Sequence, residues 1–210
     1  MDRFFRRHAE LARDYLADDH WERRAIAARH APLDEVAYLV NDNDEVVRRV
    51  VAGRLPSDAL ELLLHDPDRE VRITVAQRLA PESLLCMADD ADYMVRVVVA
   101  RRLPHGKLSR LAADPEREVR KVVAQRLPAF ALCRLLHDGE PEVRRIVAGR
   151  ALAADAVRLL DDPDWMVRLA AVTRAPVEAV RQHLDDAEAD VRQAAWQRLQ
   201  SGSPDTERKP

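Results

Sequence analysis

Arginine and carboxylate side chains recur along this chain at a fixed interval, and they are the residues whose types could do chemistry. A guanidinium group can hold a carboxylate through two parallel hydrogen bonds, or it can bind a phosphate. The first arginine row follows valine in all but its first member and comprises Arg24, Arg48, Arg72, Arg96, Arg120, Arg144, Arg168 and Arg192. The second arginine row comprises Arg54, Arg78, Arg102, Arg126, Arg150, Arg174 and Arg198. Both rows have a spacing of 24 residues, which points either to internal ion pairing or to recognition of an anion.

Internal ion pairing is the favoured interpretation, because two rows of acids keep the same spacing. Asp68 stands four residues before Arg72, the favourable order for an ion pair within a helix, worth about 0.2–0.5 kcal/mol. Asp66 can cap its own helix and accept from an arginine of the neighbouring repeat. The predicted ladder of ion pairs between repeats comprises Asp66, Asp68, Arg72, Arg78, Asp90, Asp92, Arg96, Arg102, Asp114, Glu116, Arg120 and Arg126.

The alternative is an arginine row exposed to phosphate. In that case the chain would be a nucleic-acid-binding protein, and its affinity would fall steeply with salt. The formal net charge of -3 removes the usual bulk argument for a nucleic acid or an anionic membrane as partner. We therefore expect nucleic acid to be the less favoured partner.

Other reactive side chains form no recognisable site. Cys133 and His137 are four residues apart and could share a helix face, but two ligands do not make a metal site. The sequence motifs of serine hydrolases, phosphate-binding loops and zinc peptidases are absent, as is the calcium-loop spacing. We therefore expect no catalytic residue, no metal site and no cofactor, and hence no enzyme.

Composition predicts a folded protein of the cytoplasm. Hydrophobic residues make up 47% of the 210 residues and charged residues 34%, which is enough apolar material for a core. Cys86 and Cys133 are too few and too far apart for a disulfide framework. The start of the sequence lacks the apolar segment of a signal peptide, and no apolar run approaches the ~20 residues that span a bilayer.

An internal repeat of 24 residues organises the chain. The pair Val-Arg occurs seven times at this interval without an insertion or deletion. Eight such repeats fill residues 9–200. Residues 1–8 form an N-terminal lead that we expect to cap the first repeat, and the composition of residues 201–210 predicts a disordered tail.

Each repeat contains two helical stretches of unequal length. Residues 56–66 carry leucines at helical spacing but are too short for more than about two turns. Residues 66–79 have Asp66 as an expected N-cap, Pro67 at the first helical position and Pro81 after the end. Because 24 residues cannot hold two average helices and their turns, we expect the shorter stretch to be a 3-10 helix.

The repeat resembles the leucine-rich repeat variant family. The resemblance rests on cores of the form D-P-D-x-x-V-R-x-x-V-A-x-R-L-P, of which residues 114–128 are an example with glutamate in the third position. It covers about nine-tenths of the chain. It implies an all-α solenoid of eight repeats, in which α-helices and short 3-10 helices alternate in a right-handed superhelix without a sheet.

Members of that family can carry a cysteine-rich N-terminal segment that binds an iron–sulphur cluster. No cysteine precedes Cys86 here, and a cluster needs four thiolate ligands in most cases. The resemblance therefore brings no cluster to this sequence unless a longer N-terminus with such a segment exists. An accessory role in an iron–sulphur-related system, with that segment missing, is kept as an alternative.

The main functional prediction is a monomeric, non-catalytic scaffold that binds another protein along its stacked repeats. In most repeats at least one of the two positions before Val-Arg is charged or polar, but the pair is Tyr93-Met94 in one repeat and Trp165-Met166 in another. Aromatic residues and methionine are enriched at the centres of protein interfaces. With a rise of about 10 Å per repeat, the two pairs would lie ~30 Å apart. We predict that these four residues contact a partner, with local packing as the alternative.

Overall fold

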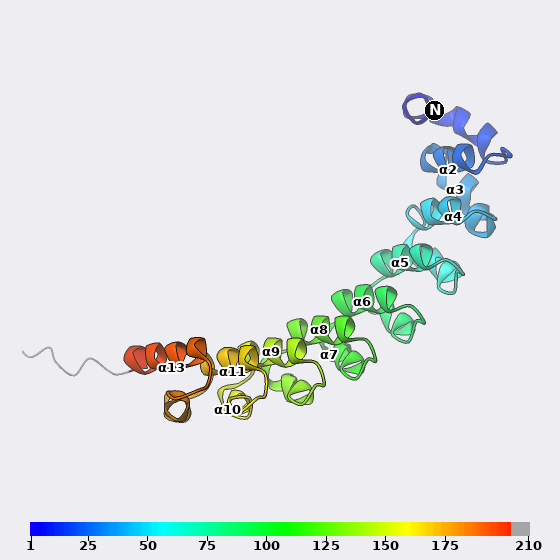
Figure 1. The fold of residues 1–210 in the computed structure, drawn as a ribbon. Coiled ribbons are helices and arrows are strands. Elements are labelled where there is room, and N and C mark those ends of the chain that lie inside the picture. Colours follow the sequence, from blue (N-terminus) through cyan, green and yellow to red (C-terminus); the bar gives the residue numbers. More distant parts are fainter. Residues whose placement is uncertain (203–210) are drawn as a thin grey trace, which may run out of the picture. The chain divides into compact units, whose positions relative to one another are not determined.

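Every regular element of residues 1–202, the part of the chain that the computed structural model describes, is a helix, and no strand occurs in that range. The chain divides into two units, Met1–Pro104 and His105–Pro210. Each unit contains its own series of long and short helices (Figure 1). The predicted all-α fold, with no sheet, is confirmed for the described range.

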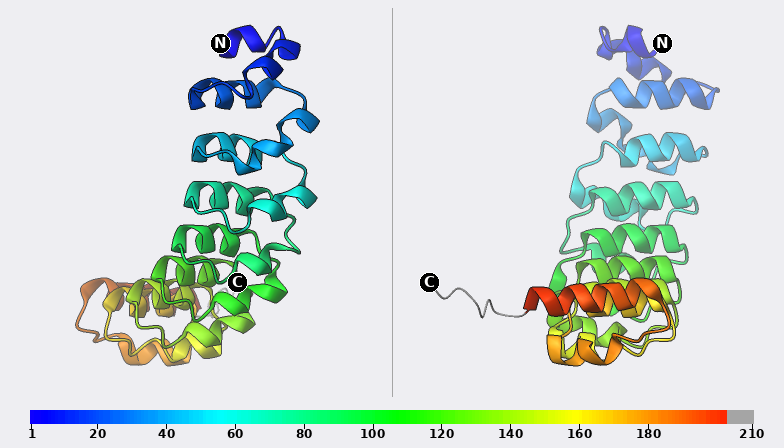
Figure 2. Two further views of the ribbon diagram at one scale, coloured as in Figure 1. Left: turned by 90° about the vertical axis from the view of Figure 1, so that its right-hand side faces the viewer. Right: turned by 60° about the vertical axis from the view of Figure 1, so that its left-hand side comes forward.

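The first unit holds ten helical elements. These are α1 (Asp2–Phe5), η1 (Ala9–Tyr15), α2 (Trp21–His30), α3 (Leu33–Val36), η2 (Ala37–Asn41), α4 (Glu45–Ala52), η3 (Ser57–Leu63), α5 (Arg69–Arg78), η4 (Leu84–Met87) and α6 (Tyr93–Arg102), where η denotes a 3-10 helix. The long helices α2, α4, α5 and α6 pack side by side in chain order (Figure 2). The short elements connect successive long helices.

The second unit repeats this arrangement. Its elements are α7 (His105–Leu108), η5 (Ser109–Leu111), α8 (Arg117–Arg126), η6 (Ala129–Leu135), α9 (Pro141–Arg150), α10 (Ala153–Val157), α11 (Trp165–Val172), α12 (Val177–Val180), η7 (Arg181–His183) and α13 (Ala189–Gly202). Here α8 packs on α9, α9 on α11 and α11 on α13. The predicted alternation is confirmed, although some short stretches begin with or consist of a brief α-helical turn.

A leucine and valine core lies between the long and short helices of each repeat. In the repeat around α5, Leu60 and Leu63 of η3 and Val71 and Val75 of α5 are at most 2% exposed. Leu79, just after α5, is equally buried. Because the same positions are apolar in each repeat, stacking joins these side chains into one continuous core within a unit.

The start of α5 differs from the predicted one by two to three residues. The helix begins at Arg69, and its N-cap is Asp68, whose carboxylate accepts from the backbone N–H of Glu70 at 2.9 Å and of Val71 at 3.1 Å. Asp66 instead accepts from the backbone N–H of Asp68 at 2.9 Å, which holds the turn before the helix. The expected N-cap at Asp66 and the helical position of Pro67 were therefore wrong.

The N-terminal lead packs onto the first repeat. Phe5 of α1 is 1% exposed and meets the ring of Tyr15 edge-on, with the ring centroids 5.2 Å apart. The ring of His30, at the end of α2, lies 6.4 Å from the Phe5 centroid. Helix α1 thus covers apolar groups at the end of the stack that would otherwise face water.

The final helix reaches further than predicted. Helix α13 continues through Gly202, and the Ser201 hydroxyl donates to the carbonyl oxygens of Gln197 at 3.0 Å and Arg198 at 3.1 Å. The predicted disordered tail at 201–210 is therefore wrong for its first two residues, and 203–210 lie outside the described residues. None of the described helices is both long enough and apolar enough to span a membrane.

Candidate functional site

The first arginine row joins each repeat to the next through a fixed set of bonds. Arg72 of α5 donates from Nε and Nη2 to the two carboxylate oxygens of Asp90, at 2.9 and 3.1 Å. Its Nη1 donates to the carbonyl oxygens of Asp66 at 2.7 Å and Pro67 at 3.2 Å. One guanidinium group therefore ties the turn before its own helix to the turn before the next helix.

The same bidentate pair recurs within both units. Its members are Arg24–Asp42, Arg48–Asp66 and Arg72–Asp90 in the first unit and Arg120–Asp138, Arg144–Asp162 and Arg168–Asp186 in the second. At the end of the first unit, Arg96 donates from Nη1 to the carbonyl oxygens of Asp90 at 2.7 Å and Ala91 at 3.3 Å. The Asp114 carboxylate accepts from the backbone N–H of Glu116 at 2.8 Å.

The aspartate side chains of these pairs are largely buried, and burial and hydrogen bonds shift the pKa values of some of them. Burial alone would raise the pKa of the Asp162 carboxyl, but the hydrogen bonds from Arg144 and from the backbone N–H of Asp164 lower it. The Arg168 guanidinium lowers the pKa of Asp186, and the bond to Asp162 raises the pKa of Arg144. Asp162, Asp186 and Arg144 are therefore held in their charged forms.

Asp68 belongs to an acid row whose aspartates cap helices and do not form the predicted pairs within a helix, and the capping aspartates are Asp44, Asp68, Asp92 and Asp164. Asp68 uses its carboxylate as the N-cap of α5, while Arg72 turns to the neighbouring repeat. Asp92 likewise accepts from the backbone N–H of Met94 at 2.8 Å. Glu116 stands at the N-cap of α8 without a side-chain cap bond. The expected Asp68–Arg72 pair was wrong because the orphan N–H groups of the first turn take the carboxylate.

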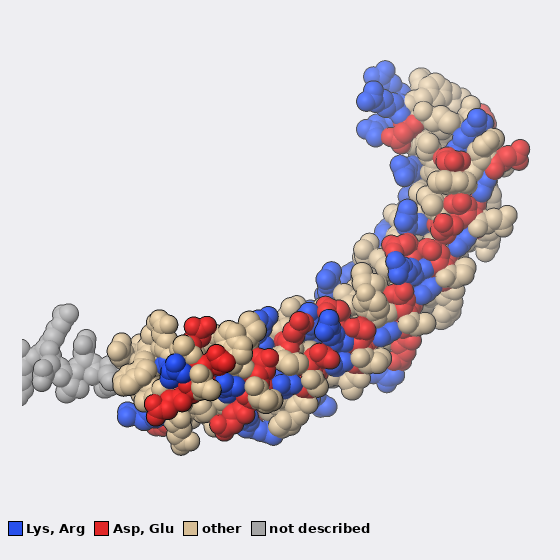
Figure 3. Space-filling view, viewed as in Figure 1, with Lys and Arg blue, Asp and Glu red and all other residues tan. Residues whose placement is uncertain are grey.

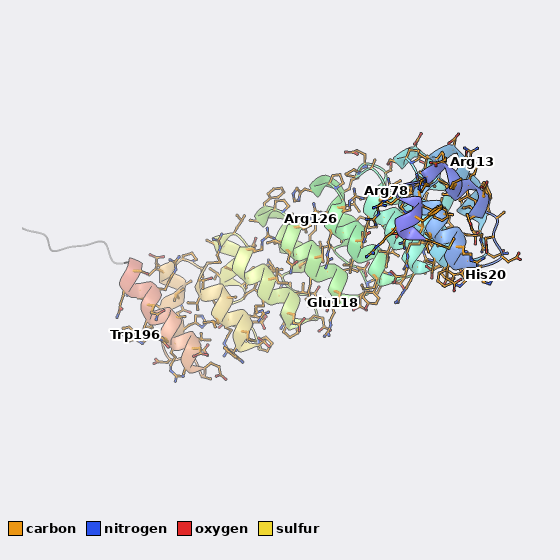
Figure 4. All side chains as sticks on the ribbon, turned by 90° about the horizontal axis from the view of Figure 1, so that it is seen from above. Arg13, His20, Arg78, Glu118, Arg126 and Trp196 are labelled. Carbon is orange, nitrogen blue, oxygen red and sulfur yellow. The ribbon has the colours of Figure 1, made fainter. Side chains whose placement is uncertain are left out.

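The second arginine row binds backbone carbonyls instead of acids. Arg78 donates from Nη1 to the carbonyl oxygens of Ala52 and Leu55, both at 2.6 Å (Figure 4). Arg102 donates in the same way to Ala76 at 2.7 Å and Leu79 at 2.8 Å. The Ala52 and Ala76 carbonyls lie in the last turn of the preceding long helix, where C=O groups have no partner within the helix, and the Leu55 and Leu79 carbonyls lie just after that helix.

This arrangement corrects the ladder prediction for Arg78 and Arg102. Neither side chain pairs with a carboxylate, because the negative end of the preceding helix offers closer acceptors. Arg126 occupies the matching position of α8 and is half-buried. Arg54, Arg78 and Arg102 therefore link repeats by donating to carbonyls at the C-terminal end of the preceding long helix, whereas the first row forms ion pairs between repeats.

The predicted partner-binding residues lie at the first turns of two long helices, one in each unit. Tyr93 and Met94 begin α6 and are each 40% exposed. In the second unit Trp165 begins α11 and is half-buried, while Met166 is 41% exposed and its sulfur lies 3.9 Å from Nη1 of Arg145. The structure thus leaves three of the four side chains exposed.

Sequence reasoning missed a third member of this position. Trp21 is the first residue of α2, is 40% exposed, and stands 72 residues before Tyr93, which itself stands 72 residues before Trp165. A comparison of all eight repeats at this position would have found it. We call the positions of Trp21, Tyr93 and Trp165 the aromatic position of the repeat.

The cysteines and histidines form no metal site. Cys86 and Cys133 are exposed, and the Cys86 thiol donates to the carbonyl of Ser83, with a pKa raised by burial. His137 lies 2.8 Å from Nη2 of Arg158, a cation that disfavours a metal at the Cys133–His137 pair. Over residues 1–202, no group of three or more His, Cys, Asp or Glu side chains is placed to hold a metal ion.

A stack of helical repeats that is tied together by arginine bonds between neighbours defines an α-solenoid repeat protein. The family model of the leucine rich repeat variant matches residues 46–68. The solved structure of "a leucine-rich repeat variant with a novel repetitive protein structural motif" is 55% identical, with a TM-score of 0.89, over 94% of this chain and 84% of that chain. The chain belongs to the leucine-rich repeat variant family.

The remaining comparisons add less. The crystal structure of an engineered protein covers 93% of this chain and 79% of that chain at 17% identity, with a TM-score of 0.45. Comparison with curated protein sequences gives no match.

Proposed function

We propose that this protein is a non-catalytic scaffold of the cytoplasm that binds another protein through the exposed face of its long helices. The observation that carries the proposal is the exposure of Trp21 and Tyr93 at the aromatic position, where three other repeats carry the charged residues Glu45, Arg69 and Arg117. Interface centres favour aromatic residues and methionine, because these bury a large area with few rotatable bonds.

Tyr93 and Met94 illustrate such a contact point in the first unit. Both are 40% exposed at the start of α6, and Asp92 and Arg69 lie beside them, with Arg69 Nη1 3.8 Å from the Asp92 carboxylate. An apolar pair with a polar rim matches the usual anatomy of a protein interface. Charged groups of both signs are mixed over the visible face of the molecule (Figure 3).

The grooves of the surface support a role without catalysis. One groove of about 580 Å³ in the first unit is lined by His65, Arg72, Cys86 and Asp90 among others. Of its charged groups, Arg72 and Asp90 bind each other, and the Cys86 thiol donates to a backbone carbonyl. An activated nucleophile needs an adjacent base or a lowered pKa, and Cys86 has a raised one.

The test is partner capture with matched variants. The wild-type chain, a Tyr93→Ala/Met94→Ala variant and a Trp165→Ala/Met166→Ala variant are immobilised, and the proteins captured from the source cell are identified by mass spectrometry. Tyr38→Ala serves as the control, because Tyr38 is 57% exposed on η2 and lies outside the aromatic position. We expect a specific partner to be lost with at least one double variant and kept with the control. Equal capture by all four folded proteins would contradict the proposal.

A further inference from the structure

The guanidinium groups of the first arginine row show what a fully bonded arginine looks like in this repeat. In Arg48, Nη1 donates to the carbonyl oxygens of Asp42 at 2.8 Å and Asn43 at 3.2 Å. The opposite side of the group, which carries Nε and Nη2 and is called here the Nε/Nη2 edge, binds the Asp66 carboxylate at 2.8 and 3.0 Å. Two carbonyls on one side and one carboxylate on the other therefore complete the group.

In the first unit, the arginines of the second row bind two carbonyls through Nη1, but no carboxylate in the described part of the chain binds their Nε/Nη2 edge. Nη1 of Arg54 donates to Ala28 at 2.5 Å and Ala31 at 2.6 Å, and Arg78 and Arg102 bind the equivalent carbonyls one and two repeats later. Among residues 1–202, no group bonds to the Nε/Nη2 edge of these three side chains. The bonds of Nη1 therefore hold the guanidinium group in place, and its Nε and Nη2 donors remain available to a ligand.

These open edges face water and are not sealed inside the fold. Arg78 is exposed, and Arg54 and Arg102 are half-buried. The described side chains include two buried nitrogen or oxygen atoms without a partner, on Glu35 and Arg198, and neither belongs to these three arginines. A ligand can therefore reach each edge from solvent.

The charge on this row is not balanced by an acid of the same repeat. Burial lowers the pKa of Arg54, with no acid raising it, whereas the hydrogen bond that Arg48 donates to Asp66 raises the pKa of Arg48. The partners of the row are carbonyl dipoles, which hold the cation in position and leave its full charge available. At each arginine of the row, an anion would therefore be attracted by the positive charge and could accept hydrogen bonds from Nε and Nη2, which are already held in position.

We infer that Arg54, Arg78 and Arg102 form a docking row for an extended acidic segment of a partner protein, with one carboxylate on each Nε/Nη2 edge. This inference rests on the proposed protein-binding function and states the chemistry of the partner. Packed helices lie about 8–10 Å apart, so the row repeats at that interval. In the extended polyproline II conformation, which has three residues per turn and a rise of about 3.1 Å per residue, every third residue lies on the same face about 9 Å apart, so acids at every third residue of the partner would be in register with the row.

A nucleic-acid backbone fits the row less well. Asp58 is exposed on η3, three residues after the Leu55 carbonyl that anchors Arg78. An exposed acid in the same repeat as Arg78 repels a continuous polyanion, whereas a peptide can place a neutral residue opposite it. The whole chain also carries a formal charge of -3. Carboxylates spaced by neutral residues match this mixed surface.

The second unit continues this pattern only in part. Arg150 donates from Nη1 to the carbonyl oxygen of Ala124. Arg174 turns its Nε and Nη2 to the carbonyl oxygen of Ala151, at 3.4 and 3.3 Å, so that its edge is occupied. The Nε atom of Arg198 is buried. Three successive arginines with an open edge lie in the first unit, and the docking row is assigned to them.

The experiment measures binding of two labelled peptides by fluorescence anisotropy at low salt. The first repeats Glu-Gly-Ser four times, and the second has the same composition with its four glutamates adjacent. The full chain is compared with Arg78→Gln, with Arg78→Lys, which keeps the charge but lacks the planar fork, and with Arg49→Gln. Arg49 is exposed on α4 outside the row and controls for the loss of one charge. Circular dichroism establishes that each variant is folded.

We expect the spaced peptide to bind about fivefold or more tightly than the grouped one. Arg78→Gln and Arg78→Lys should each weaken it by about three- to tenfold, because a charge-assisted bidentate contact is lost. Arg49→Gln should change binding by less than about twofold. The two peptides are also compared on the unmodified chain. This comparison tests the inference even if Arg78→Gln fails to fold.

Three results would overturn the inference. The first is equal binding of the two peptides, or no binding, and the second is an equal effect of Arg49→Gln and Arg78→Gln. The third is another occupant of the row, seen as tighter Arg78-dependent binding of labelled duplex DNA or RNA, or as Arg78-dependent self-association in sedimentation. If the peptides fail while partner capture depends on Tyr93 or Trp165, the docking row is wrong and the scaffold proposal stands. If the spaced peptide binds through Arg78 but no partner is captured, the docking row stands and the scaffold proposal fails its test.

Discussion

Arg48 of one repeat and Asp66 of the next are joined by two parallel hydrogen bonds, Nε to Oδ2 at 2.8 Å and Nη2 to Oδ1 at 3.0 Å. Both residues are buried, at 9% and 7% exposure. The Asp66 carboxylate also accepts from the backbone N–H of Asp68, so the pair holds the turn from which α5 starts. Stacking of repeats and the start of each long helix thus depend on the same carboxylate.

Asp66→Ala is expected to destabilise the chain by about 3–5 kcal/mol, because it leaves the buried Arg48 charge without its partner. Urea unfolding followed by circular dichroism gives the free energy of unfolding. Asp58→Ala removes an exposed acid of the same repeat and is expected to cost about 0.5 kcal/mol or less. Similar losses in the two variants would show that the pair does not stabilise the stack.

The two N-cap positions Asp68 and Glu116 should respond differently to alanine. Asp68 accepts two backbone N–H bonds, so Asp68→Ala is expected to cost about 1 kcal/mol. Glu116 makes no cap bond with its side chain, and Glu116→Ala is expected to cost less than about 0.5 kcal/mol. Urea melts of both variants test this, and a larger loss for Glu116→Ala would contradict the assignment of caps.

The repeat, its helical character and the importance of the two arginine rows could be predicted from the sequence. Spacing alone shows that Arg72 and Arg78 recur at fixed positions and that acids recur beside them. A guanidinium that must stay charged near a core needs an acceptor, and an acid of the neighbouring repeat is the acceptor that a sequence displays. This reasoning holds for Arg72, whose acceptor is Asp90.

It fails for Arg78 because backbone carbonyls are present at every residue and leave no mark in the sequence. The C-terminal carbonyls of α4 are free only because that helix ends where it does, and Arg78 reaches them only in the stacked arrangement. The exchange of roles between Asp66 and Asp68 has a similar cause. Either aspartate suits a cap, and the position of Arg48 in the preceding repeat decides between them.

Stability should fall in acid as the aspartates of the ion pairs take up protons. The pKa values of Asp42, Asp162 and Asp186 are lowered below the ordinary 3.8, because hydrogen bonds from arginine and backbone N–H groups outweigh burial. Such groups stabilise the fold fully above the unfolded pKa and lose that contribution as the pH falls through the folded pKa. We expect the urea midpoint to be flat near neutral pH and to drop from about pH 5 downward. Asp186→Asn should reduce this drop, and an unchanged pH profile in that variant would contradict the linkage.

Arg102→Ala tests the second arginine row. The variant removes the donor to the carbonyl oxygens of Ala76 and Leu79, and it also removes part of the contact between α5 and α6. We expect a loss of about 1–3 kcal/mol, because the two carbonyls must find water or remain unpaired. The loss should not depend on pH between 3 and 7, since no carboxylate is involved, and this distinguishes the row from the ion pairs.

Gln77→Ala, on the exposed side of α5, is the control for Arg102→Ala and should cost about 0.5 kcal/mol or less. Urea melts of both variants at pH 7 and pH 4 provide the four measurements. Arg102→Lys should recover part of the stability, because its single ammonium can still donate to the helix end. A loss in Arg102→Ala that shrinks on acidification would mean that Arg102 pairs with an acid after all, and that the carbonyl contacts are secondary.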